Sequence, residues 1–261
     1  MHVFKEVRVL TKFLSHQLTG KSRRGYGIHS PFAYKLVCDI FLDRRAYPEL
    51  TAIQDLRKGL SEKDRRLIYP DRGAGSKHGS HRSRKVSELV QTISTRPRHG
   101  RILFLLGRRF GPANMIELGT GLGLGTCYLA LSSPGSRVYT IESSAPLLTL
   151  ARENFKKVGV DNIQALHHEF SAGLEILQHT VGRFDLVFFD GNHRYQPTLE
   201  YYEQCMGRAH EQSVFIFDDI HWSLEMERAW ESIKADDRVR MTIDIFQMGL
   251  VFFRKELSRQ H

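Results

Sequence analysis

The stretch that decides the fold is MIELGTGLGLG, residues 115–125. A short β-rich run ends at Leu118, and glycines then occupy positions 119, 121 and 123 before a helical pattern begins. Glycines at such a turn let the backbone bend sharply and let a ligand lie against it. The spacing does not fit the G-x-G-x-x-G pattern of dinucleotide-binding loops. It fits acidic-x-G-x-G-x-G, in which Glu117 is the acidic residue.

Short β-rich runs alternate with amphipathic stretches beyond this loop. We predict strands at 115–118, 137–141, 163–168, 184–190, 213–218, 240–246 and 250–254, and helices near 124–132, 145–158, 171–179, 195–208 and 223–234. Such alternation indicates a parallel sheet covered by helices on both faces. Only the tripeptide QMG joins the last two runs, which is too short for a crossover helix, so we predict an antiparallel hairpin there.

A second acidic residue accompanies the glycine loop. Glu142 follows the next β-rich run, 25 residues after Glu117. A carboxylate at the tip of the second strand can accept hydrogen bonds from both ribose hydroxyls of a nucleoside. A tight turn without a ligand is the alternative, and the paired acid disfavours it.

Loop, spaced acid and strand pattern together resemble the class I S-adenosylmethionine-dependent methyltransferases over residues 113–254. The resemblance implies a Rossmann-like α/β fold with a seven-stranded sheet, a terminal antiparallel hairpin and a helical N-terminal extension. It implies S-adenosylmethionine as the cofactor, bound by Glu117, Gly119, Thr120, Gly121, Gly123, Glu142, Phe170 and Ser171. Ordinary core packing is the alternative for the phenylalanine.

Carboxylates follow the fourth and fifth predicted strands. Asp190 and His193 lie in DGNH, and Asp218 and Asp219 end the fifth run. Carboxylates at one sheet edge repel one another and suit a hard cation. These positions resemble the metal-dependent O-methyltransferases of catechol and sugar type.

That resemblance implies one divalent cation, Mg²⁺, held by Asp190, Asp218 and Asp219. It also implies that Asp190 and His193 are catalytic, with His193 removing the proton of the acceptor hydroxyl. Helix capping is the alternative for the aspartates. For His193 the alternative is a hydrogen bond that orients an aspartate.

The charge is unevenly distributed along the chain. Residues 1–112 carry 24 Lys and Arg against 9 Asp and Glu, whereas residues 113–261 carry 14 against 20. We therefore divide the chain into a basic helical N-terminal extension or lid, residues 1–112, and a methyltransferase domain, residues 113–261. The basic excess indicates an anionic partner, with solvated helix faces as the alternative.

The N-terminal part shows helical periodicity. We predict helices at 3–18, from the N-cap Ser30, at 48–60, at 84–94 and at 98–110, and a loop from 69 to 85. We assign the basic side chains of this loop to an anionic group on the acceptor: Lys77, Arg82, Arg84 and Lys85.

Composition narrows the class of protein. Of 261 residues, 41% are hydrophobic and 26% charged, as in globular proteins. No run of 18 apolar residues predicts a transmembrane helix. Three widely spaced cysteines without a CxxC motif argue against a disulfide framework, so we expect a reducing, cytoplasmic location.

The acceptor is the least determined feature. We expect O-methylation of a hydroxyl on a small molecule, sugar or lipid precursor, with an anionic acceptor in view of the basic N-terminal part. One alternative is an RNA ribose methyltransferase that docks nucleic acid through that part. A second is a non-catalytic, cofactor-binding partner protein. The sequence leaves a homo-oligomer open.

Overall fold

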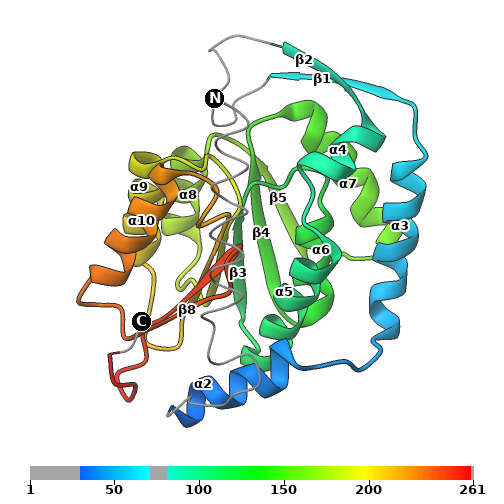
Figure 1. Ribbon diagram of the computed structural model, residues 1–261. Helices are drawn as coiled ribbons and strands as arrows, with labels where there is room; N and C mark the ends of the chain where they lie inside the picture. The colour runs from blue at the N-terminus through cyan, green and yellow to red at the C-terminus, as the bar shows by residue number, and fades with distance from the viewer. Residues whose placement is uncertain (1–29, 71–80, 260–261) are drawn as a thin grey trace.

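A computed structural model describes residues 30–70 and 81–259, and one seven-stranded sheet forms its centre, in the order β5-β4-β3-β6-β7-β9-β8 (Figure 1). The strands are β3 (Asn114–Leu118), β4 (Arg137–Glu142), β5 (Ile163–His167), β6 (Leu186–Phe189), β7 (Val214–Asp218), β8 (Met241–Asp244) and β9 (Met248–Phe252). The first five are parallel, and β9 runs antiparallel to both β7 and β8. The predicted sheet and its terminal hairpin are confirmed.

Helices cover both faces of the sheet. One face carries α3 (Thr51–Ser61), α4 (Val86–Thr92), α5 (Pro97–Phe110), α6 (Leu124–Ser132) and α7 (Ala145–Val158). The other carries α8 (Phe170–Thr180), α9 (Tyr195–Met206) and α10 (Leu224–Ala235). Alternation along β3 separates the two cores, because Met115 packs on the first face and Ile116 on the second.

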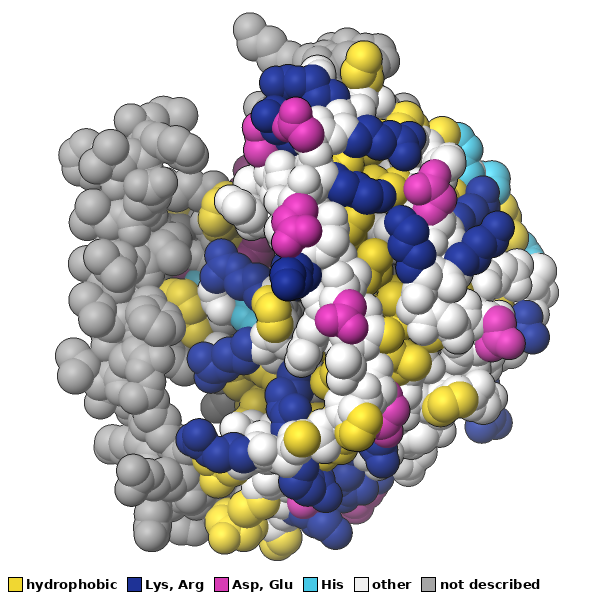
Figure 2. Space-filling model, turned by 90° about the vertical axis from the view of Figure 1, so that its right-hand side faces the viewer, with side chains coloured by type: hydrophobic (Ala, Val, Ile, Leu, Met, Phe, Trp, Pro, Cys, Tyr) yellow, Lys and Arg dark blue, Asp and Glu magenta, His cyan; other side chains and the backbone are white. Residues whose placement is uncertain are grey.

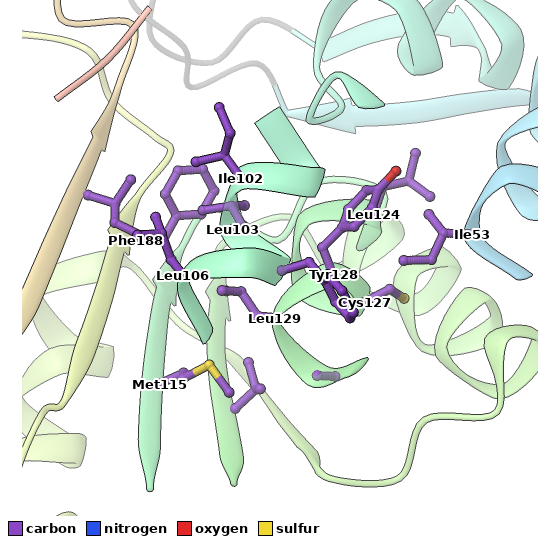
Figure 3. Close-up of a cluster of buried hydrophobic side chains, with 14 of the residues drawn as sticks. Ile53, Ile102, Leu103, Leu106, Met115, Leu124, Cys127, Tyr128, Leu129 and Phe188 are labelled. Atoms are coloured by element: carbon purple, nitrogen blue, oxygen red, sulfur yellow. The ribbon is translucent and has the colours of Figure 1, made fainter. Parts of the chain in front are cut away.

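The N-terminal helices belong to the same core as the sheet. Ile53 of α3 and Leu103 of α5 are fully buried in one cluster with Met115 of β3 and Phe188 of β6 (Figure 3). A Cβ on Gly100 of α5 would lie 2.1 Å from the ring of a tyrosine in α6, so glycine permits the close packing of these two helices. The described residues before β3, 30–70 and 81–112, therefore complete one face of the core.

The described part begins with the predicted N-cap. The Ser30 hydroxyl accepts a hydrogen bond from Ala33 N at the start of α2 (Pro31–Leu36). A π-helical turn, η1 (Val37–Phe41), continues α2, and a 3₁₀ turn, η2 (Pro48–Leu50), leads into α3. The predicted helix at 3–18 lies outside the described residues.

The predicted loop at 69–85 is wrong at both ends. Strand β1 (Arg66–Pro70) pairs with β2 (His81–Lys85) in a separate antiparallel ribbon. Leu67 and Tyr69 are buried while Ile68 between them is exposed, which is the alternation of a strand with one face on the core. The intervening residues, including Lys77, lie outside the described part, as does the Arg82 side chain.

Part of the basic excess is neutralised within the fold. Three arginines of α5 form ion pairs with acids of the segment 39–49: Arg101 with Asp43 at 2.5 Å, Arg108 with Glu49 at 3.0 Å and Arg109 with Asp39 at 3.3 Å. On the face shown in Figure 2, the remaining Lys and Arg side chains are interspersed with acidic and apolar ones. No described helix has both the length and the apolar character needed to cross a membrane.

Candidate active site at the strand ends

The glycine loop brings two strand ends together. Gly119, Gly121 and Gly123 all have positive φ, at 106°, 52° and 78°. A Cβ on Gly119 would lie 2.1 Å from the backbone oxygen of Asp190, the residue after β6. Only glycine therefore lets the chain leave β3 this close to the end of β6. The loop then enters α6 at Leu124.

Glu142 closes the loop from the neighbouring strand. It ends β4, and its Oε2 accepts a hydrogen bond from Gly121 N at 3.0 Å. Its Oε1 accepts one from Ser144 N at 2.9 Å. Burial raises the pKa of this carboxyl, and the backbone hydrogen bonds oppose that rise. Each oxygen keeps lone-pair capacity for a further donor.

Glu117 lies beneath the loop and is 1% exposed. The hydroxyls of Thr126 and Thr140 donate to its Oε2, the second at 2.6 Å. Thr120 Oγ1 lies 2.6 Å from Thr140 Oγ1, so the predicted cofactor-binding threonine belongs to this buried network. Burial raises the pKa of Glu117 to about 7, and the two hydroxyl donors oppose the rise.

The raised pKa of Glu117 makes folding stability depend on pH. Its folded pKa of about 7 exceeds the reference value of 4.5, so its contribution is fully present below pH 4.5 and is lost as pH rises through 7. We expect the free energy of unfolding to fall by up to about 3 kcal/mol over this range from Glu117 alone. Denaturant unfolding at pH 5 and pH 8 measures it.

Glu117→Gln should reduce that fall, and Glu175→Gln, at an exposed position on α8, should leave it unchanged. Asp190 and Asp218 will keep a slope of the same sign, because their pKa values are also raised. An identical fall in wild type and Glu117→Gln would contradict the ionisation assigned to Glu117.

Phe170 begins α8 near the end of β6. A Cβ on Gly191 would lie 2.6 Å from its ring, and its ring meets that of Tyr201 edge-on at 5.5 Å. Phe170 is therefore half-buried at the strand-end edge, whereas Ser171 is exposed. The adenine contact predicted for both residues stays a prediction.

The structure brings the predicted aspartates of β6 and β7 together. Burial raises the pKa of Asp190 well above its usual value, with the charge of Asp219 adding to the effect. Burial also raises the pKa of Asp218, and the charge of Asp190 adds to it. Asp219 follows with a φ of 55°. The Oδ1 atom of Asp218 is buried without a hydrogen-bond partner in the described residues.

His193 lies beside this pair, with its Nε2 4.0 Å from Asp190 Oδ1. That distance places the imidazole next to the carboxyl without a direct hydrogen bond. Across residues 30–70 and 81–259, no three His, Cys, Asp or Glu side chains form a group that could hold a metal ion. Asp190, Asp218 and Asp219 therefore form no such group in this arrangement, and the magnesium site predicted for them stays a prediction.

His99 is a site residue that sequence reasoning missed. It lies in the first turn of α5, is 7% exposed, and its Nε2 lies 2.7 Å from Oε1 of Gln247 in the β8–β9 hairpin. Its Nδ1 faces Asp218 Oδ1 at 3.8 Å. Burial lowers its pKa, so the imidazole is neutral at pH 7. The sequence around His99, Arg96-Pro97-Arg98-His99, contains no pattern that would predict its contacts with Gln247 and Asp218.

The chain is similar in sequence to known methyltransferases. The family profile described as a methyltransferase domain matches residues 116–220. A catechol O-methyltransferase from Niastella koreensis is 24% identical over 134 residues, which cover 50% of this chain and 60% of that protein. A protein-L-isoaspartate O-methyltransferase from Nitrosomonas europaea is 40% identical over 88 residues, 32% of this chain and 38% of that protein. Both matches span less than two thirds of the relative.

A solved structure agrees over a longer part of the chain. The O-methyltransferase from Bacillus cereus in complex with S-adenosylhomocysteine covers 84% of this chain and 96% of its own, with a TM-score of 0.59 and 19% identity. Such a likeness shows the shared fold. Together with the profile match and the glycine loop, it confirms the resemblance drawn from the sequence: residues 116–220 match a methyltransferase domain, and the chain shares the Rossmann-like fold of a solved O-methyltransferase.

Proposed function

We propose that the protein is an S-adenosylmethionine-dependent O-methyltransferase acting on a hydroxyl of a small molecule. The observation that carries the proposal is the pairing of the glycine loop with Glu142, whose two oxygens are held by the amides of Gly121 and Ser144. This arrangement presents a carboxylate to the two hydroxyls of a ribose beside a backbone that a ligand can approach closely.

The side chains at the strand ends fit the acceptor half of the reaction. S-adenosylmethionine supplies an activated methyl group, so the chain has to orient the acceptor and remove its proton. His193 can take that proton, because a neutral imidazole has a suitable basicity. Asp190, 4.0 Å away, can stabilise the imidazolium that forms. Proton removal is assigned to side chains because the described carboxylates form no metal-ligand group.

Glu142→Ala should weaken binding of S-adenosylhomocysteine by roughly 10- to 100-fold. The variant leaves two ribose hydroxyls without their charged acceptor, and such hydrogen bonds contribute about 1.5–3 kcal/mol. Titration calorimetry measures it, with Glu175→Ala as the control because this exposed glutamate lies on α8. Equal affinity of wild type and Glu142→Ala, or tighter binding of NAD, would remove the assignment.

The acceptor can be found without assuming its identity. Methyl-labelled S-adenosylmethionine and the protein are added to a metabolite extract, and labelled products are separated and identified. A parallel reaction contains total RNA instead of the extract. Label in a small-molecule hydroxyl supports the proposal, whereas label in RNA alone would replace it with the nucleic-acid alternative.

A further inference from the structure

One short turn spans both halves of the candidate site. Residues 95–99 comprise the end of the connection from α4 and the first residues of α5, and Thr95 and His99 are each 7% exposed. A Cβ on the second residue of α6 would meet Thr95 Oγ1 at 2.6 Å and Glu117 Oε1 at 2.7 Å, so Thr95 borders the network beneath the glycine loop. His99 faces Asp218 at the other end. The turn therefore runs from the cofactor side of the site to the acceptor side.

The turn is fixed from both sides. The Arg57 guanidinium donates to the carbonyl oxygens of Thr95 and Val90. Beyond the turn, Leu103 and Leu106 of α5 point into the core beneath it (Figure 3). Side chains on this turn are therefore presented from a rigid support, which lowers the entropy lost when they bind a ligand.

The outward side chains of the turn are two arginines. Arg96 and Arg98 are exposed, and neither guanidinium has a hydrogen bond, ion pair or ring contact with the described residues. Arg96 is the N-cap of α5 and Arg98 lies in its first turn, which contains no acidic residue. Cations at a helix N-terminus are unfavourable, because the helix dipole is positive there.

Helix stability therefore does not account for these two arginines. At the C-terminal end of α5, by contrast, Arg108 and Arg109 interact favourably with the helix dipole, and both form ion pairs. Arg96 and Arg98 precede the buried His99 in the sequence, and their charges act on its imidazole. His99 in turn faces Asp218 at the end of β7. The rim of the acceptor side is thus cationic while its interior is acidic.

An acceptor with one anionic substituent would fit a site whose rim is cationic and whose interior is acidic. The acidic interior would disfavour the anionic substituent and the cationic rim would attract it, which leaves the hydroxyl directed inward. Arginine binds oxyanions in a bidentate way that also fixes orientation. We propose that Arg96 and Arg98 bind an oxyanion substituent, carboxylate or phosphate, of the methyl acceptor. This inference rests on the proposed function and names the acceptor class.

The first test uses inorganic phosphate as the probe on protein saturated with S-adenosylhomocysteine. Affinity is measured by NMR titration for wild type and for the double variant Arg96→Gln, Arg98→Gln. We expect about tenfold weaker binding in the variant, since both cations are exposed and each contributes modestly. The control, Arg137→Gln with Arg183→Gln, removes two exposed charges from the opposite end of the strands and should bind phosphate as wild type does.

The second test compares two probes that differ in one carboxylate, catechol and 3,4-dihydroxybenzoate. We expect wild type to bind the carboxylate-bearing probe more tightly and the double variant to bind both alike. Absence of phosphate binding, equal affinity in wild type and variant, or an equal loss in the control would each overturn the proposal. So would an oligoribonucleotide that binds through the same arginines with a steep salt dependence, because it would assign them to nucleic acid.

Calorimetry with S-adenosylhomocysteine separates this proposal from the proposed function. The double variant should bind S-adenosylhomocysteine as wild type does, because Arg96 and Arg98 lie outside the ribose and loop contacts. If S-adenosylhomocysteine binds and phosphate does not, only the acceptor inference fails. If S-adenosylhomocysteine does not bind, the proposed function fails, and the phosphate titration, repeated on the protein without S-adenosylhomocysteine, tests the arginines by themselves.

Discussion

His193→Ala is expected to slow methyl transfer to the identified acceptor by about 10²–10⁴-fold, the range of general acid–base catalysis. The imidazole lies 4.0 Å from Asp190 at the strand ends and is about one-fifth exposed, so an acceptor hydroxyl can reach it. Single-turnover transfer from labelled S-adenosylmethionine measures the rate. Affinity for S-adenosylhomocysteine should be unchanged.

The control is His168→Ala, which removes an exposed histidine on the loop after β5. A loss below tenfold in His193→Ala would show that His193 only orients Asp190. In that case Asp190→Asn should reduce the rate more than His193→Ala does. If His193 is the base, His193→Ala should have the larger effect.

Gly119→Ala should destabilise the protein by more than about 3 kcal/mol. A Cβ there would lie 2.1 Å from the Asp190 carbonyl oxygen, and the φ of 106° is strained for any residue with a side chain. The loop and the end of β6 must separate, which also disrupts the cofactor contacts proposed for this loop. Chemical denaturation measures stability, and calorimetry measures the accompanying loss of S-adenosylhomocysteine binding.

Substitutions at two further glycines distinguish the cost of backbone strain from the cost of a steric clash. Gly111 has a φ of 55° with open space around its Cβ position, so Gly111→Ala should cost only about 1 kcal/mol. Gly182 has open space and no positive φ, so Gly182→Ala should lie within about 1 kcal/mol of wild type. If Gly119→Ala costs no more than Gly111→Ala, the close approach to β6 is not what requires glycine.

The sheet was predictable because its information is local. Each strand is a short apolar run bounded by turn residues. The spacing of the loop glycines predicts a tight turn with backbone angles that favour glycine. Glu117 and Glu142 were predictable for a related reason, since a parallel sheet places the carboxyl ends of its strands at one edge. The structure places Asp190 and Asp218 together on the same principle.

The remaining features depend on contacts far apart in the sequence. His99 meets Gln247 across 148 residues, and nothing near either residue indicates that contact. The β1–β2 ribbon escaped prediction because five-residue strands beside a glycine-rich segment read as loop. The metal site was inferred from like charges at one edge, but burial can hold such a pair by raising its pKa without a cation.

The position of β9 has a consequence for synthesis. Strand β9 lies between β7 and β8, although it is made last of the three. Until it emerges, β7 (Val214–Asp218) has an open edge of almost entirely apolar residues. At 5–20 residues per second, the 29 residues between the end of β7 and the start of β9 take roughly 1.5–6 s to translate. During that interval the nascent chain exposes a strand edge prone to intermolecular pairing, so a ribosome stalled in this segment would leave an aggregation-prone product.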